Sequence, residues 1–134
     1  MEAAAFASWL DKLKTALDEM DGLAFAALFS NNAVFYEAPF NAPRKGRAAI
    51  RSAIDEMANL RRESRFSAQV IGIEPNVGWA IWENAFTRAG TDDPVRLEGI
   101  LKARFNAKGL CTEFQQWWHK LEPGQDDLMR DFDA

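Results

Sequence analysis

The sequence has few of the residues on which many catalytic and metal sites depend. Its 134 residues include one cysteine, one histidine and one tyrosine. A single cysteine excludes an internal disulfide, and one histidine with one cysteine argues against a His/Cys metal site. We therefore expect no metal and no cofactor. We interpret Cys111 as a small packing residue in a strand and not as a nucleophile.

Positive charge and long apolar runs are also scarce. The formal net charge is -4 at pH 7, so no general basic field exists for nucleic acid. The arginines at 44–51 and at 61–65 are either solvated helix faces or an anion-binding mouth. No stretch approaches the roughly 18 apolar residues that cross a bilayer, and the start M-E-A-A-A-F lacks a secretory pattern. We expect a cytoplasmic protein with no nucleic-acid or membrane partner.

Aromatic residues are plentiful, with five tryptophans and ten phenylalanines. This number favours an aromatic-lined interior or interface, although an ordinary aromatic core has the same composition. The last predicted strand, 111–121, contains two adjacent tryptophans and the only histidine. Neighbouring strand residues point to opposite faces. One face therefore carries Phe114, Gln116 and Trp118, and the other carries Gln115, Trp117 and His119. One should look into a cavity or core, and the other toward helices or a partner subunit.

The order of the patterns along the chain predicts an α+β fold. Apolar residues at helical spacing indicate three helices, at 3–20, 23–30 and about 47–62. Strand-forming residues indicate five strands, at 33–37, 65–74, 77–88, 95–105 and 111–121. Short turns join the last four strands, which should form an antiparallel meander. We predict a single domain over residues 1–122 and an acidic C-terminal tail over residues 123–134.

Three sequence blocks carry a resemblance to a known family. They are F-A-A-L-F-S-N-N-A-V-F at 25–35, G-R-A-A-I-R at 46–51 and F-N-A-K-G-L at 105–110. In this order they resemble the nuclear transport factor 2-like superfamily, which includes ketosteroid isomerase, limonene epoxide hydrolase, scytalone dehydratase and the SnoaL-like polyketide cyclases. The resemblance covers about residues 5–121. It implies a cone-shaped, curved, mixed β-sheet wrapped around N-terminal helices, in the order αα-β-α-ββββ, with a conical pocket. It also implies a homodimer formed through the outer face of the sheet.

The catalytic residues of two members of that superfamily are missing here. The positions matching the tyrosine and two aspartates of ketosteroid isomerase fall near Leu13, Ala38 and Leu101, which cannot perform that chemistry. The region matching the Asp-Arg-Asp arrangement of limonene epoxide hydrolase contains Trp82, Asn84, Phe86 and Gln116. We therefore expect neither activity. A SnoaL-like cyclase needs only an acid or a histidine on the pocket wall, so that class stays open.

Glu37 and His119 are the predicted catalytic residues. Glu37 follows an apolar strand, and burial at the pocket would raise its pKa and suit a general base. The alternative for Glu37 is a rim carboxylate paired with Arg44 or Arg47. His119 has an ordinary pKa near neutrality, but it lies opposite Trp118 by parity, so only one of the two can face the cavity.

The predicted ligand-binding residues are apolar, aromatic and amide side chains. Such a set would hold a small, partly polar ring well, or it would simply fill the core. It comprises Trp9, Leu13, Phe35, Trp82, Asn84, Phe86, Phe114, Gln116 and Trp118. We predict a SnoaL-like domain protein that binds a small apolar or aromatic molecule, with isomerase, cyclase or dehydratase chemistry. The alternative is a non-catalytic ligand-binding or protein-interaction module, so whether the protein is an enzyme stays open.

Overall fold

The computed structural model describes residues 1–123. The first part of the chain forms α1 (Ala3–Asp18), α2 (Gly22–Ala26), β1 (Phe29–Tyr36), β2 (Arg44–Lys45) and α3 (Arg47–Leu60). Four long strands follow, namely β3 (Arg61–Glu74), β4 (Val77–Arg88), β5 (Pro94–Phe105) and β6 (Cys111–Leu121). The predicted α+β class is confirmed. The predicted tail lies outside the described residues, apart from Pro123.

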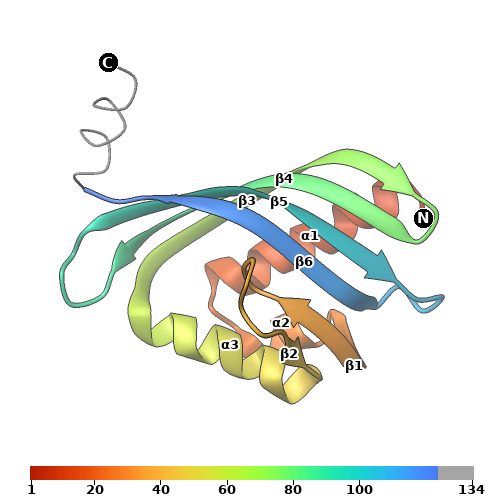
Figure 1. Cartoon of the computed structure of the whole chain (residues 1–134), viewed down its shortest axis with the longest axis horizontal. Coiled ribbons are helices and arrows are strands. Elements are labelled where there is room, and N and C mark those ends of the chain that lie inside the picture. Colours follow the sequence, from red (N-terminus) through yellow and green to blue (C-terminus); the bar gives the residue numbers. More distant parts are fainter. Residues whose placement is uncertain (124–134) are drawn as a thin grey trace.

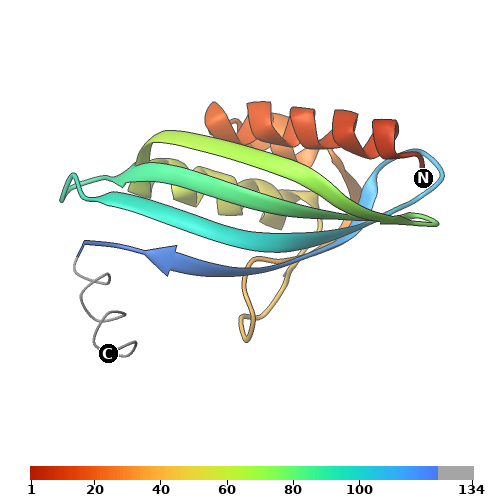
Figure 2. The ribbon, with the colours of Figure 1, turned by 90° about the horizontal axis from the view of Figure 1, so that it is seen from above.

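One curved, mixed sheet organises the molecule. Its strand order is β2-β1-β6-β5-β4-β3. The last four strands form the predicted antiparallel meander, and β1 joins its free edge parallel to β6. Figure 1 shows these long strands arching over the three helices, and Figure 2 shows α1 running alongside β3. The helices therefore cover the concave face, and no helix within residues 1–123 covers the convex face.

Aromatic rings connect the helices to the concave face. Phe29 is fully buried, and its ring centroid lies 5.2 Å from that of Phe25, 5.8 Å from that of Phe35 and 6.0 Å from that of Phe114. Edge-to-face and tilted pairs at such distances are favourable beyond their buried area. Near the start of α1, the ring of Phe6 packs against Gly78 of β4, where an added Cβ would lie 2.6 Å from that ring. Glycine at position 78 thus lets α1 pack directly on the backbone of β4.

The predicted boundaries differ most from the structure at the two places where the chain passes from helix to strand. The helix predicted at 23–30 ends at Ala26, because Phe29 pairs with Cys111 of the distant β6 and begins β1. The helix predicted to reach residue 62 ends at Leu60, and Arg61 opens β3 opposite Arg88. The sequence analysis also missed β2, whose two residues pair antiparallel with β1. Pairing between distant segments overrides local helical propensity at these positions.

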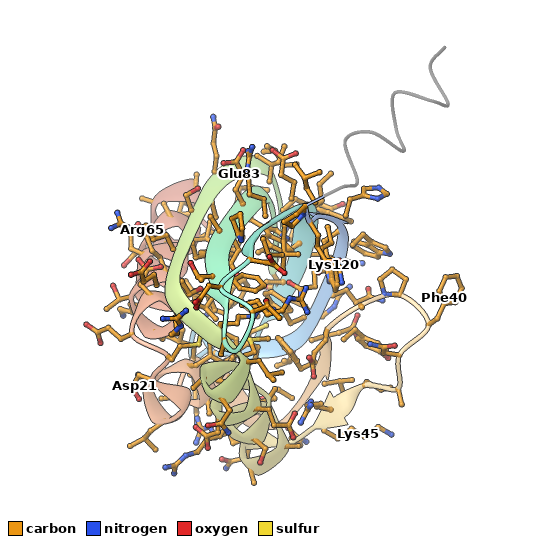
Figure 3. All side chains as sticks on the ribbon, turned by 90° about the vertical axis from the view of Figure 1, so that its left-hand side faces the viewer. Asp21, Phe40, Lys45, Arg65, Glu83 and Lys120 are labelled. Carbon is orange, nitrogen blue, oxygen red and sulfur yellow. The ribbon has the colours of Figure 1, made fainter. Side chains whose placement is uncertain are left out.

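The loop between β1 and β2 carries an exposed aromatic side chain. Phe40 is fully exposed at the tip of the loop between β1 and β2, where Figure 3 shows it projecting away from the body. None of the helices within residues 1–123 has the length and apolar character that spanning a membrane requires.

Candidate functional site

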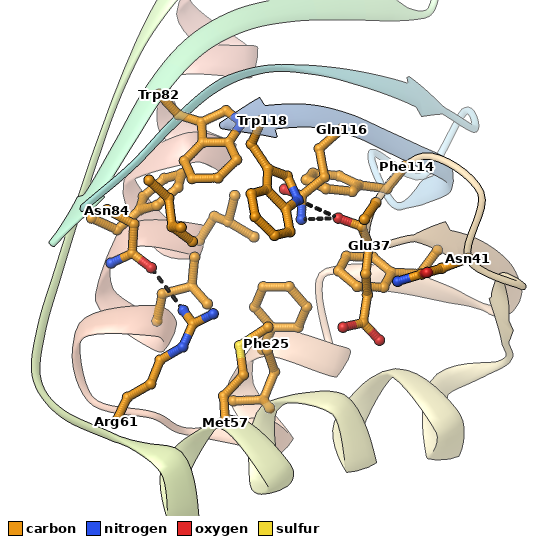
Figure 4. A pocket seen from close by; sticks show the side chains of 17 residues that line it. Phe25, Glu37, Asn41, Met57, Arg61, Trp82, Asn84, Phe114, Gln116 and Trp118 are labelled. Atoms are coloured by element: carbon orange, nitrogen blue, oxygen red, sulfur yellow. Dashed lines mark hydrogen bonds between the residues drawn. The ribbon is translucent and has the colours of Figure 1, made fainter. Parts of the chain in front are cut away.

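A cavity of about 100 Å³ lies between the concave face of the sheet and the helices. Figure 4 shows its walls, which come from all three helices, from β1 and the loop after it, and from the long strands. Most of the wall is apolar, and these residues are Leu13, Leu17, Phe25, Phe35, Ala38, Ile54, Met57, Phe66, Trp82, Leu97, Phe114 and Trp118. A dry apolar cavity of about 150 Å³ can hold a benzene molecule. The present volume therefore suits one small ring or a short chain.

Strand alternation explains why these residues meet. Trp82 and Asn84 are buried inward-facing residues of β4, whereas Glu83 between them is exposed. On β6, Phe114 is buried and Gln116 and Trp118 also reach the cavity, whereas Trp117 is exposed on the other face. The sequence analysis left open which face of the last strand would look into the cavity, and the structure places the face with Phe114, Gln116 and Trp118 there.

Arg61 and Asn84 form the polar part of one wall. Nη1 of Arg61 donates a hydrogen bond to Oδ1 of Asn84 at 2.9 Å. The amide nitrogen of Asn84 donates to the hydroxyl of Ser64 at 3.0 Å and to the carbonyl of Arg65 at 2.8 Å. These two acceptors fix the orientation of the amide, so that its oxygen must face the guanidinium. Asn84 therefore positions Arg61 and has no donor left for a ligand.

Arg61 carries its charge into an apolar environment. Burial lowers the pKa of Arg61 to about 10, and the negative charge of Glu37 partly opposes that shift. The guanidinium also lies over the ring of Phe86, 4.2 Å from its centroid. Figure 4 shows the guanidinium ending inside the cavity. At neutral pH the wall therefore presents a positive charge, which no carboxylate within residues 1–123 contacts in an ion pair.

Glu37 lies on the wall opposite Arg61 and is held through both its backbone and its side chain (Figure 4). Its carbonyl accepts hydrogen bonds from Nε2 of Gln116 at 2.7 Å and from Nε1 of Trp118 at 2.8 Å. Its carboxylate is paired with Nε of Arg44. Arg44 also pairs with Glu56 on α3, and the two carboxylates, Glu56 first, raise the pKa of Arg44. Glu37 thus both lines the cavity and forms the rim ion pair that the sequence analysis left as the alternative.

The structure brings most of the predicted site residues together and leaves three outside. The cavity wall includes Glu37, Leu13, Phe35, Trp82, Asn84, Phe114, Gln116 and Trp118. Trp9 lies in the core, where its indole nitrogen donates to the carbonyl of Leu28 at 3.2 Å. Phe86 lies beneath Arg61 and lines a separate open groove. His119 is exposed on the convex face, in register with Glu98 of β5.

Arg61 is the main feature that the sequence analysis did not assign to the site. The arginines at 61–65 were the available signal, with an anion-binding mouth as one of two interpretations. A helix reaching residue 62 would have left Arg61 on a helix face. Because β3 begins at Arg61, this side chain turns into the cavity, whereas Arg62 is exposed and pairs with Asp92.

No group of His, Cys, Asp or Glu side chains within residues 1–123 is arranged to hold a metal ion.

The single cysteine is not accessible to solvent. Cys111 is fully buried, and burial raises the pKa of its thiol far above the ordinary value. A thiol held protonated is a poor nucleophile, so the packing role predicted for Cys111 agrees with its environment.

The chain belongs to the SnoaL-like domain family, whose model matches residues 10–114. Among solved structures, Rv0760c from Mycobacterium tuberculosis is 13% identical with a TM-score of 0.78, covering 91% of this chain and 98% of that one. The Δ5-3-ketosteroid isomerase from Mycobacterium sp. is 15% identical with a TM-score of 0.73, covering 88% and 98%. SalBIII, an epoxide hydrolase/cyclase-like enzyme of pyran ring formation in salinomycin, is 15% identical with a TM-score of 0.74, covering 84% and 89%. At these identities the likeness shows the fold alone. A comparison with curated proteins gave no match.

We predict that Trp118→Phe loosens the loop between β1 and β2, residues 37–43, which borders the cavity. The substitution keeps a ring on the wall but removes the N–H that donates to the Glu37 carbonyl, at a cost of about 1 kcal/mol in the free energy of unfolding. Backbone amides of residues 38–42 should then exchange with deuterium faster, as measured by mass spectrometry. Trp117→Phe, on the opposite face, is the matched control and should leave that exchange unchanged. Equal exchange in the two variants would contradict the role of this hydrogen bond.

Proposed function

We propose that the cavity binds a small molecule with an apolar or aromatic body. The observation that carries the proposal is a largely apolar cavity whose wall contains a few convergent polar groups, those of Arg61, Glu37 and Gln116. Small-molecule sites typically have this composition. Rv0760c has been solved with estradiol-17β-hemisuccinate, and a computationally designed 17-OHP binder shares the fold. Those relatives support binding as the function, whereas the cavity volume favours a ligand smaller than a steroid.

Binding should be detectable with a neutral single-ring probe and should be lost when the cavity is filled. We expect benzamide to raise the melting temperature and to titrate in calorimetry, because a ligand that binds only the folded state stabilises it. Met57→Trp places a larger side chain on the cavity wall and should weaken binding by about tenfold or more. Leu60→Trp, on the same helix at an exposed position, should bind as the unmodified protein does. Absence of binding to the unmodified protein would favour the alternative, a protein-interaction module.

The second candidate function is proton transfer within the same cavity. The observation that favours it is the Glu37 carboxylate on the wall, half-buried and held in place by Arg44. A positioned carboxylate can take a proton from a carbon next to a carbonyl and return it to another carbon, as in an isomerase. In a cyclase, the enolate formed would instead attack a second carbonyl carbon of the same molecule, and the oxygen of that carbonyl would take the proton. The exposed position of His119 gives no comparable support, so we assign the proton-carrying role to Glu37 alone.

Proton transfer predicts exchange of the hydrogens next to the carbonyl of a small ring ketone. In heavy water, the protein should accelerate deuterium incorporation into cyclohexanone, followed by proton NMR. Glu37→Gln should remove the acceleration, lowering the rate by about 100-fold or more. Glu56→Gln is the matched control, because Glu56 contacts the same arginine but is exposed outside the cavity. If Glu37→Gln leaves the rate unchanged, the protein binds without this chemistry.

We also propose that the convex face of the sheet forms a homodimer. The register places Ile81, Ile100 and Trp117 in one row across β4, β5 and β6, and each is at least 39% exposed. Contiguous apolar groups on a sheet face typically mark an interaction surface. A two-fold interface uses the same patch on both copies, and a row of aliphatic and aromatic groups can be self-complementary.

Light scattering after size exclusion should therefore give twice the mass of the chain. Ile100→Lys places a charge at the centre of the row and should yield a monomer, because an unpaired charge is costly in an apolar interface. Leu23→Lys changes an equally apolar residue that is 64% exposed on α2, away from the sheet face, and should remain dimeric. A monomeric unmodified protein would refute this assembly.

A further inference from the structure

Arg61 is a half-buried cation that forms no ion pair with a carboxylate of the described residues. It lines the cavity with apolar neighbours such as Leu17 and Met57. Charged groups removed from water are normally paired, because an isolated buried charge is strongly unfavourable. None of the ion pairs within residues 1–123 involves Arg61. Arg61 keeps its charge at neutral pH, with a pKa of about 10, on a wall where its partners are one neutral amide and one aromatic ring.

The guanidinium has unused donors that face the cavity. A guanidinium carries five N–H donors, and only Nη1 donates to a side chain of the described residues, to Asn84 at 2.9 Å. The ring of Phe86 covers one flat face of the group. Figure 4 shows the remaining edge of Arg61 directed into the space between Trp82, Met57 and Phe25. The remaining N–H groups of Arg61 therefore face the cavity and donate to no acceptor among the described residues.

The acid on the opposite wall does not meet this need. The Glu37 carboxylate is already paired with Arg44. Its charge acts on Arg61 only at a distance, and this effect on the pKa of Arg61 is smaller than the opposite effect of burial. Neighbouring amides are also occupied, since Asn84 is bonded at both its nitrogen and its oxygen and Gln116 donates to the Glu37 carbonyl.

We propose that Arg61 binds the carboxylate of a small organic acid whose apolar ring or chain fills the cavity. A guanidinium matches a carboxylate in shape and charge, and the pair forms strong, directed hydrogen bonds. The apolar body would lie against the rings of Phe25, Phe35 and Phe114, which line the same cavity. This inference rests on the proposed binding function and names the chemical class of its ligand.

The cavity volume limits the size of that acid. At about 100 Å³, the space suits a single ring with its carboxylate or a short aliphatic acid. Asn84 is a positioning residue in this arrangement, because Ser64 and the backbone of Arg65 orient its amide toward Arg61. The anion site is therefore built from a chain of hydrogen bonds and not from a flexible surface arginine.

The test compares two probes of the same shape, benzoate and benzamide, by calorimetric titration at neutral pH. Because hydrogen bonds to a charged group are among the stronger ones, benzoate should bind about 10- to 100-fold more tightly than benzamide. Arg61→Met should abolish this preference, so that benzoate and benzamide bind with affinities within about threefold of each other. Arg62→Met is the matched control, because Arg62 is the exposed neighbour that pairs with Asp92, and it should keep the preference for benzoate.

Each outcome separates this inference from the proposed function. Equal binding of the two probes to the unmodified protein would overturn the anion site and leave cavity binding intact, whereas binding of neither would overturn both. A preference for benzoate that survives in a folded Arg61→Met variant would overturn the assignment to Arg61. Arg61→Lys provides a second variant if Arg61→Met does not fold. It keeps the charge without the planar fork, so it should retain a preference for benzoate at reduced affinity, and no preference in that variant would count against the proposal.

Discussion

The cavity depends on two hydrogen bonds that reach the same backbone oxygen. Gln116 and Trp118, two residues apart on β6, both donate to the carbonyl of Glu37 just beyond the end of β1. They continue the parallel pairing of β1 with β6 past its last paired residue, Tyr36. This connection holds the loop after β1 beside the sheet and places the Glu37 carboxylate on the cavity wall. The same hydrogen bond ties the indole of Trp118 to the loop, and the ring forms part of the cavity wall.

The polar groups of the cavity lie on two walls, which differ in how their charged side chains are paired. Around Glu37, Arg44 pairs with two carboxylates, those of Glu37 and Glu56, and Glu56 is exposed, so water screens that group. Around Arg61, one charge is held by a neutral amide and an aromatic ring. Replacing a buried ionic group by an apolar one of similar size is often neutral or stabilising. The hydrogen bond to Asn84 and the contact with Phe86 leave the charge of Arg61 without an ion pair among the described residues, and the anion that we propose would supply one.

The sequence predicts the parts of this structure that local periodicity controls. Alternation along 111–121 correctly separates Trp118 from His119, and it places Trp82 and Asn84 on one face of their strand. The failures occur where distant segments meet. Phe29 leaves a helical pattern because Cys111 pairs with it. The predicted helix extends two residues past the end of α3 and therefore places Arg61 on a helix face. In β3 the same side chain points in another direction, because side chains are arranged differently on a helix and on a strand. The engagement of Asn84 with Ser64 and Arg65 also depends on a strand register that no local pattern specifies.

Membership in the SnoaL-like family does not identify the ligand, but the aromatic residues of this chain limit the size of the ligand that the cavity can hold. The rings of Phe35 and Phe114 stack with centroids 5.0 Å apart, and those of Phe66 and Trp82 stack at 5.8 Å, on the wall of the same cavity. These contacts stabilise the core and at the same time occupy space that a multi-ring ligand would need. Enlarging the cavity would remove buried aromatic area, and truncation of a buried phenylalanine to alanine costs about 3–5 kcal/mol. Ligand size and core stability are therefore set by the same side chains. A small ligand that keeps these rings in contact requires no such loss, and the acid group that we propose for it would pair with Arg61 on the same wall.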